Sequence, residues 1–159
     1  PKDWSKVDLC PAMYLADQTR LQEHLVLESP DLVLIGRRQL RSNNSWLHNA
    51  KRLMKGKDRC TLLVHPDDAK THDIQKGDRV RIRSRVGEVE VPVQISTEMM
   101  PGVVSLPHGW GHGRKGVSWT TAAAHPGASI NDLTDEQRVD ALSGNAALSG
   151  TPVQISPVR

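Results

Sequence analysis

Short apolar runs and regular alternation recur along the chain, and both patterns are typical of β-strands. Residues 32–35 and residues 60–64 are apolar runs, which predict strands buried on both faces. Residues 79–95 alternate between apolar and charged positions, which predicts a hairpin with one buried and one solvated face. Two further short strands are expected at residues 103–106 and 152–155.

The solvated face of the expected hairpin carries charge of both signs. Glu88 and Glu90 follow a row of arginines at alternate positions: Arg79, Arg81, Arg83 and Arg85. Cross-strand ion pairs explain this row more simply than contact with nucleic acid. Pro92 donates no ladder hydrogen bond, so its strand is expected to lie at an edge or to be interrupted there.

Three segments have helical patterns. A polar segment around residues 17–25 ends before Pro30, and residues 66–72 begin with a proline suited to the first helical position. Apolar residues of segment 46–54 recur on one helical face, with Asn44 or Ser45 as the cap and Gly56 as the stop. The polar residues before this third helix would therefore meet a helix N-terminus, which favours an anion.

Several short strands, few helices and no alternation of strands with helices favour a mainly β barrel with short helical crossovers. The 159 residues suit a single domain. We expect residues 1–30 to be a lead-in segment, partly irregular or helical, and residues 31–159 to form the barrel domain.

The amino-acid composition indicates which classes of partner the chain could bind. The chain has four Trp, one Tyr and no Phe, which argues against modules that stack nucleic-acid bases on aromatic side chains. Between residues 37 and 59 there are eight Lys and Arg residues against Asp58 alone, whereas the whole chain has a formal net charge of +3. Such a concentration suggests a local anionic partner, although a solvated basic face is the alternative.

The ends of the chain and its cysteines give little information about localisation or metal binding. The chain begins at Pro1 rather than Met, so we expect a fragment of a longer polypeptide, and no signal peptide or membrane span is recognisable. Localisation is left open, with the cytoplasm favoured. Cys10 and Cys60 lie far apart and fit no zinc-ligand spacing.

The glycine-rich segment 108–116 (HGWGHGRKG) offers two interpretations. His108 and His112, with His125 further on, could form a metal site. The glycines make a helix improbable there, however, and neither an acid nor a cysteine is adjacent. We therefore interpret it as a loop that brings backbone groups and an imidazole to a ligand. No nucleophile–base pair is recognisable, so no catalytic residue and no metal ligand is expected in this chain.

The order of the motifs resembles the C-terminal molybdopterin-dinucleotide-binding domain of the molybdopterin oxidoreductases, which include formate dehydrogenases, nitrate reductases and dimethyl sulfoxide reductase. The resemblance covers residues 31–156 and rests on LVLIGRRQLRSNNSWLHN, LLVHPDDAKTHDIQKGDRVRIRSRVGEVEVPVQI, MMPGVVSLPHGWGH and INDLTDEQRVDALSGNAAL. The formate-dehydrogenase-like branch looks nearest. The resemblance implies a double-psi β-barrel.

The resemblance also implies a ligand, molybdopterin guanine dinucleotide, held between domains. Arg37 would contact phosphate or pterin oxygens, Arg41–Ser45 would supply side-chain and helix-N-terminal donors, and Asn131 would pair with a pterin or guanine edge. The cofactor-binding residues implied by the match are Gly36, Arg37, Arg41, Ser42, Asn43, Asn44, Ser45, His108, Gly109 and Asn131.

In the family the ligand of molybdenum or tungsten and the iron–sulfur cluster motif lie in other domains. The resemblance therefore implies a clamping domain that is inactive alone, with the rest of the parent oxidoreductase and electron-transfer subunits as partners and no nucleic acid. One alternative is a non-catalytic double-psi barrel module that binds a peptide, nucleic acid or protein. A self-cleaving, pyruvoyl-forming decarboxylase is disfavoured, because both serine–glycine pairs, Ser143-Gly144 and Ser149-Gly150, have the wrong order.

Overall fold

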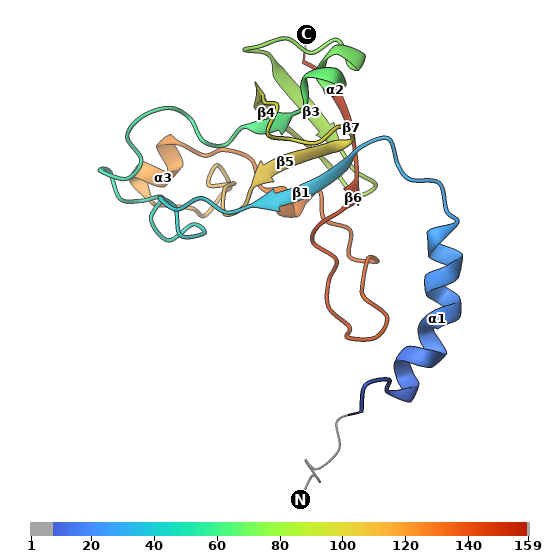
Figure 1. Ribbon diagram of the computed structural model, residues 1–159. Coiled ribbons are helices and arrows are strands. Elements are labelled where there is room, and N and C mark those ends of the chain that lie inside the picture. The colour runs from blue at the N-terminus through green and yellow to red at the C-terminus, as the bar shows by residue number, and fades with distance from the viewer. Residues whose placement is uncertain (1–7, 159) are drawn as a thin grey trace, which may run out of the picture.

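A computed structural model of the chain describes residues 8–158. These residues form one seven-stranded sheet with the order β6-β1-β5-β2-β4-β3-β7 (Figure 1). The strands are β1 (Val33–Arg37), β2 (Leu62–Val64), β3 (Arg79–Arg83), β4 (Glu88–Ile95), β5 (Val103–Pro107), β6 (Thr151–Pro152) and β7 (Gln154–Pro157). The helical elements are α1 (Ala12–Leu25), α2 (Pro66–Thr71), α3 (Thr120–Ala124) and the 3₁₀ turn η1 (Ile130–Asp132).

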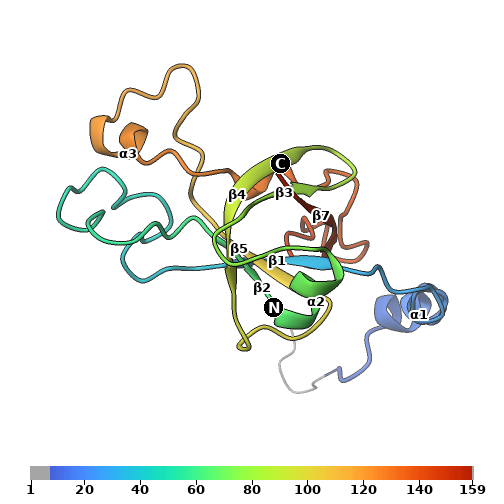
Figure 2. The same ribbon diagram turned by 90° about the horizontal axis from the view of Figure 1, so that it is seen from above.

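The sheet curls on itself, as the view from above shows (Figure 2). Its two outermost strands, β6 and β7, are separated in the chain only by Val153, whose backbone N–H donates to the Leu32 carbonyl at 3.1 Å. The pairs β1/β5 and β2/β4 are parallel, and the hairpin β3/β4 is antiparallel. The predicted fold class, a mainly β double-psi barrel with short helical crossovers, is confirmed.

The predicted hairpin and its cross-strand arginine–glutamate pairs are present. Arg81 lies opposite Glu90 and Arg83 lies opposite Glu88, with nitrogen–oxygen distances of 2.6 and 2.8 Å. Arg85 instead binds Asp135, beyond the hairpin. Three arginines of the row, Arg81, Arg83 and Arg85, are therefore in ion pairs within the molecule, and Arg79 instead donates to the Glu90 carbonyl at 3.1 Å.

Pro92 marks a change of partner in a central strand. The ladder between β4 and β3 ends at the pair Arg79–Pro92, and the ladder between β4 and β2 begins at Leu62–Val93. The interrupted strand is thus the correct alternative, and the edge strand is wrong, because β4 has a neighbour on both sides. The missing N–H costs no hydrogen bond at this change of partner.

The core is aliphatic, since the chain has no Phe to contribute. The inward residues of the strands interdigitate inside the curled sheet, and the largest fully buried ones include Leu32, Leu34, Leu62, Val80, Ile82, Val104 and Leu106. Trp110 is the one aromatic side chain among the buried core residues of segment 8–158. It belongs to the glycine-rich loop after β5, so the core extends from the barrel into that loop.

The two helices expected near residues 17–25 and 66–72 are present as α1 and α2. Helix α2 starts at Pro66, and the His65 side chain accepts a hydrogen bond from the Asp67 N–H. Helix α1 stands beside the barrel and buries none of its residues (Figure 1). Within residues 8–158, no helix has the length and apolar character that a membrane crossing requires.

The helix predicted over residues 46–54 is wrong, because this segment is a series of turns. Asn43 and Asn44 have φ angles of 41° and 64°, a left-handed conformation in which an α-helix cannot start. Trp46, placed on the inner face by the periodicity, is 78% exposed, whereas the polar His48 is fully buried. Tertiary packing of His48 has overridden a short helical pattern.

Replacing Ile82 with alanine tests the packing of the barrel. Ile82 is fully buried and pairs with Val89 of β4 and Ile155 of β7, so the cavity left by Ile82→Ala should lower the free energy of unfolding by about 2–5 kcal/mol. Urea denaturation measures this loss. The control is Arg83→Ala on the same strand, an exposed position that should unfold close to wild type. Equal midpoints for the two variants would contradict the packing described.

Candidate functional site

Two long loops leave the barrel at the same edge. The parallel strands β1 and β5 end side by side, with Arg37 opposite Pro107, and the His108 N–H donates to the Arg37 carbonyl at 3.1 Å. The loop after β1 spans residues 38–61 and the loop after β5 begins at His108. Parallel pairing therefore brings together the two polar segments that the sequence singled out (Figure 1).

Asn44 is the point of contact between these two loops. The His108 Nδ1 and the Asn44 Oδ1 lie 2.6 Å apart. A Cβ on Gly109 would lie 2.5 Å from the Asn44 carbonyl oxygen, closer than real contacts allow, and Gly109 has a φ of 94°. Only glycine meets both requirements without strain, so the loops interlock through backbone.

Asn131 joins the same region from η1. Burial, and then the nearby Arg38, lower the pKa of His108, while its interaction with the Asn131 side chain opposes them. Gly36 faces η1 as well, since a Cβ there would lie 3.7 Å from Ile130 Cδ1. The structure thus brings Asn44, His108, Gly109, Asn131 and Gly36 into one region.

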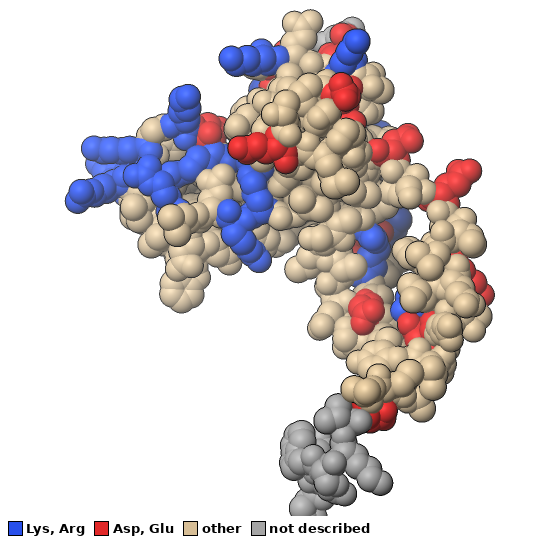
Figure 3. Space-filling model, viewed as in Figure 1, with Lys and Arg blue, Asp and Glu red and all other residues tan. Residues whose placement is uncertain are grey.

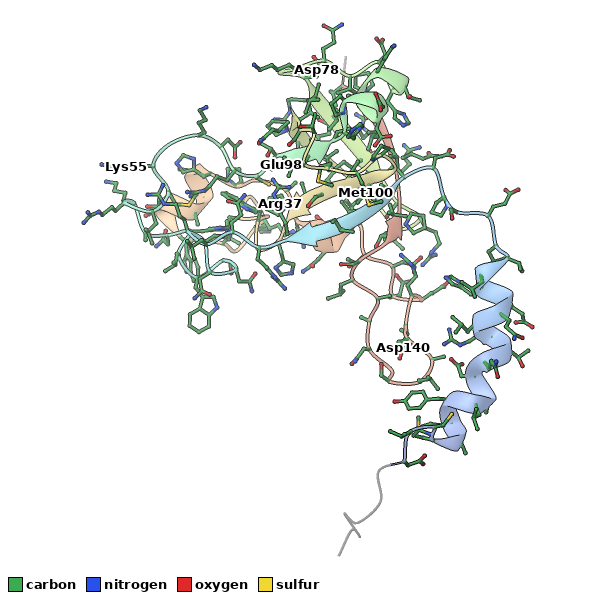
Figure 4. All side chains as sticks on the ribbon, in the orientation of Figure 1. Arg37, Lys55, Asp78, Glu98, Met100 and Asp140 are labelled. Carbon is green, nitrogen blue, oxygen red and sulfur yellow. The ribbon has the colours of Figure 1, made fainter. Side chains whose placement is uncertain are left out.

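Arg37 lies beneath this region rather than at its surface. Its guanidinium donates to the carbonyls of Ser105 and Thr61, the latter at 2.6 Å, and to the Thr61 hydroxyl at 3.1 Å. Burial lowers the pKa of Arg37 to about 10. Most of its donors are therefore used in holding three segments of the barrel together (Figure 4).

The remaining predicted residues of the first loop have different surroundings. Ser42 is buried and its hydroxyl donates to the Gln39 carbonyl at 3.1 Å. Arg41 and Asn43 are exposed, and Ser45 is half-buried. No α-helix follows them, so the expected helix-N-terminal donors are absent, and what the segment offers a ligand is its side chains and turn amides.

Sequence reasoning missed a buried layer directly below the loop contact. His48 is fully buried, its Nδ1 lies 2.7 Å from His112 Nε2, and its ring stacks on Trp110 with centroids 4.1 Å apart. The spacing of His112 and His108 suggested a metal pair, but the two imidazoles have different partners, His48 and Asn44. Residues 8–158 contain no group of three or more side chains that could hold a metal.

Burial and neighbouring groups keep this layer neutral. Burial, then His112 and Arg59, lower the pKa of His48 to about 4, and the Gly109 backbone opposes them weakly. Burial also lowers the pKa of His112. The signal that could have revealed the layer is the polar His48 within the otherwise apolar pattern of segment 46–54.

The first loop is strongly basic where it extends from the barrel. Figure 3 shows the cationic side chains gathered over this extension, and Lys55 lies near its tip in Figure 4. The exposed cations are Arg38, Arg41, Lys51, Arg52, Lys55 and Lys57. In the described residues none of these is in an ion pair, whereas Arg81, Arg83 and Arg85 are.

A cavity of about 460 Å³ lies beside the loops and is lined partly by Met54, Arg59 and Trp110.

Comparison with known families agrees with this geometry. The family described as "Molydopterin dinucleotide binding domain" matches residues 32–152, which is most of the chain. The chain belongs to this family. The matched range contains both loops and Asn131.

Curated relatives of this molybdopterin-dinucleotide-binding chain are molybdopterin oxidoreductases. It is 28% identical over 171 residues to a tetrathionate reductase subunit from Salmonella typhimurium, covering 94% of the chain and 16% of the relative. It is 30% identical over 114 residues to ArrA, the molybdopterin-containing subunit of the arsenate respiratory reductase of Chrysiogenes arsenatis, covering 69% and 13%. The chain thus spans about a sixth or less of these relatives.

Among solved structures, acetylene hydratase from Pelobacter acetylenicus superposes on 98% of the chain with a TM-score of 0.64 and 18% identity, and the match covers 21% of that protein. At this identity the likeness shows the fold alone. The predicted formate-dehydrogenase-like branch has narrower support. The alpha subunit of an F420-dependent formate dehydrogenase from Methanocaldococcus jannaschii is 39% identical, but over 46 residues and 29% of the chain.

Two glycine substitutions separate backbone collision from backbone strain. Gly109→Ala should lower the free energy of unfolding more than Gly116→Ala, because both have φ above 90° but only Gly109 meets a neighbour. We expect about 1–2 kcal/mol for the strained φ and a further ~1–3 kcal/mol for the collision with Asn44. Urea denaturation measures both. Equal losses would show that the two loops do not interlock at Asn44.

Proposed function

We propose that this chain clamps the guanine dinucleotide form of molybdopterin in a molybdopterin oxidoreductase. The observation that carries the proposal is the convergence of Asn44, His108 and Asn131 from three separate segments. The sequence resemblance implies all three as cofactor contacts. Their meeting at the edge of a rigid barrel is the usual arrangement of a binding site.

The chemistry of the loops fits an anionic, hydrogen-bonding ligand. Neither residues 36–49 nor residues 108–116 contain a carboxylate, and Arg38 and Arg41 are exposed beside the loop contact. A guanidinium can bind pyrophosphate oxygens in a bidentate manner. The amides of Asn43 and Asn131 offer both donors and acceptors to a pterin or guanine edge.

The structure refines the role we propose for each residue. Arg41, Asn43, Asn44, His108 and Asn131 would contact the dinucleotide directly. Gly36 and Gly109 would let the backbone approach the dinucleotide. Ser42 and Ser45 would shape the turns of the first loop. Arg37 would hold the strands from which both loops leave. The lowered pKa of His108 favours its neutral form, in which one imidazole nitrogen donates and the other accepts a hydrogen bond.

The parent enzyme is also part of the proposal. The bound pterin would carry molybdenum or tungsten and supply two-electron redox chemistry, with the metal ligand and an iron–sulfur cluster in other domains. This chain would bind and orient the dinucleotide and perform no catalysis alone. Its partners would be the remaining domains of the parent and electron-transfer subunits.

The formate-dehydrogenase-like branch remains our hypothesis for the reaction. Its support is a short alignment of 46 residues, whereas the tetrathionate reductase relative aligns over nearly the whole chain. Formate oxidation and tetrathionate reduction should therefore be assayed side by side with the same purified polypeptide. Activity with tetrathionate and none with formate would overturn the formate hypothesis while leaving the clamp intact.

Dinucleotide content tests the clamp itself. The longest native polypeptide that contains this segment would be purified anaerobically from a host proven to make the cofactor, then assayed for molybdenum, tungsten and acid-released guanine nucleotide. We expect Arg41→Ala plus Asn131→Ala to weaken retention about ten-fold or more, since a hydrogen bond to a charged group contributes about 1.5–3 kcal/mol. Both positions are exposed, so the barrel should fold normally.

The matched control carries Arg83→Ala plus Asn145→Ala, the same residue types at exposed positions outside the loops. It should retain the dinucleotide like wild type. Equal retention in both double variants would reject these contacts. Wild-type protein free of metal and nucleotide would reject the clamp and favour the barrel module without cofactor.

A further inference from the structure

The buried layer under the loop contact joins the same two loops as Asn44 and His108. His48 comes from the first loop and His112 from the second, and their rings meet edge to face with Nδ1 and Nε2 2.7 Å apart. Trp110 packs against His48 from the side. The two loops are therefore held together by two contacts, one at the surface through Asn44 and one in the interior through the imidazoles of His48 and His112.

A hydrogen bond between two imidazoles depends on how many protons the pair carries. When both rings are neutral, one nitrogen donates its proton to the lone pair of the other. One added proton leaves that bond in place, now charge-assisted. A second added proton removes the acceptor and places two cations at hydrogen-bond distance in a buried site.

No charged group around the pair favours its protonated form. The groups that act on His48 are His112 and Arg59, both of which disfavour its charged form, together with the Gly109 backbone, which favours it. Burial alone acts on His112. No carboxylate of the described residues is among these contributions. Protonation of both imidazoles must therefore break the hydrogen bond between them.

We propose that His48 and His112 are positioning residues that hold the second loop on the first in the form that takes the dinucleotide, and that double protonation releases them. This inference rests on the proposed function for its ligand. It assigns a role to two side chains to which the proposed function gives none. The role predicts that acid accelerates dinucleotide loss through this pair.

The size of the acid effect follows from proton linkage. When the loops separate, each imidazole reaches water and its pKa returns to about 6.5. Since the pKa values of His48 and His112 are lower in the closed arrangement, protons favour the open one. Each imidazole can raise the opening equilibrium by up to about 8-fold between pH 6 and pH 5, and the pair by up to about 60-fold.

The experiment compares dinucleotide release from wild type and His112→Gln in the longest native polypeptide. Released guanine nucleotide is followed from pH 8 to pH 5, and each protein is normalised to its own rate at pH 8. Glutamine can still bond His48 but does not titrate. We expect the acceleration between pH 6 and pH 5 to be smaller in His112→Gln than in wild type, by up to about 8-fold.

His24→Gln is the control, because His24 is an exposed imidazole on α1. It should accelerate like wild type. His108 also titrates at the loop contact, but it is present in all three proteins and cancels in the comparison. Equal acceleration in wild type and His112→Gln would overturn the proposal, since a merely structural side chain would change the rate without changing its pH dependence.

A second measurement needs neither a variant nor the dinucleotide. Ring-nitrogen NMR of the wild-type polypeptide with labelled histidine should show nitrogen–nitrogen coupling across one hydrogen bond, and that coupling should vanish at acid pH. Its absence at neutral pH would overturn the pair. If the coupling is present while wild type holds no dinucleotide, the proposed function fails and the pair stands.

Discussion

The half-buried guanidinium of Arg37 makes the hydrogen bonds on which the site depends. Removing a cation from water is costly unless its donors are satisfied. Arg37 meets this condition with carbonyls rather than with a carboxylate, because it donates to Ser105 in β5 and to Thr61 just before β2. It thereby fixes the edge where β1 and β5 end, and both loops inherit their starting positions from that edge.

Above this base the second loop is held by close backbone packing. Gly109 lies against Asn44, and a Cβ on Gly111 would lie 2.8 Å from the Ser129 side chain. Side chains at these positions would push the loop away from the first loop and from the segment that leads to Asn131. The glycines therefore preorganise the site, so that less conformational entropy is lost when a ligand binds.

Sequence patterns predicted the barrel better than they predicted the site. The hairpin was predictable because strand alternation is a local property, and its arginine–glutamate pairs followed from register. The structure of segment 46–54 was not predictable from local sequence. Asn44 contacts His108 and the buried His48 contacts His112, and both partners lie more than sixty positions away. Family resemblance supplied Asn44, His108 and Asn131, but neither it nor periodicity indicated His48.

The hairpin and the first loop differ in whether their charged side chains are paired. On the hairpin, Arg81, Arg83 and Arg85 form ion pairs with carboxylates of the same chain. On the first loop the exposed cations have no such partners within the described residues, and Leu40 and Trp46 are 97% and 78% exposed beside them. Unpaired cations together with exposed apolar side chains are features of binding surfaces. The hairpin therefore pairs most of its charges within the chain, while the first loop presents unpaired cations and apolar side chains at the surface.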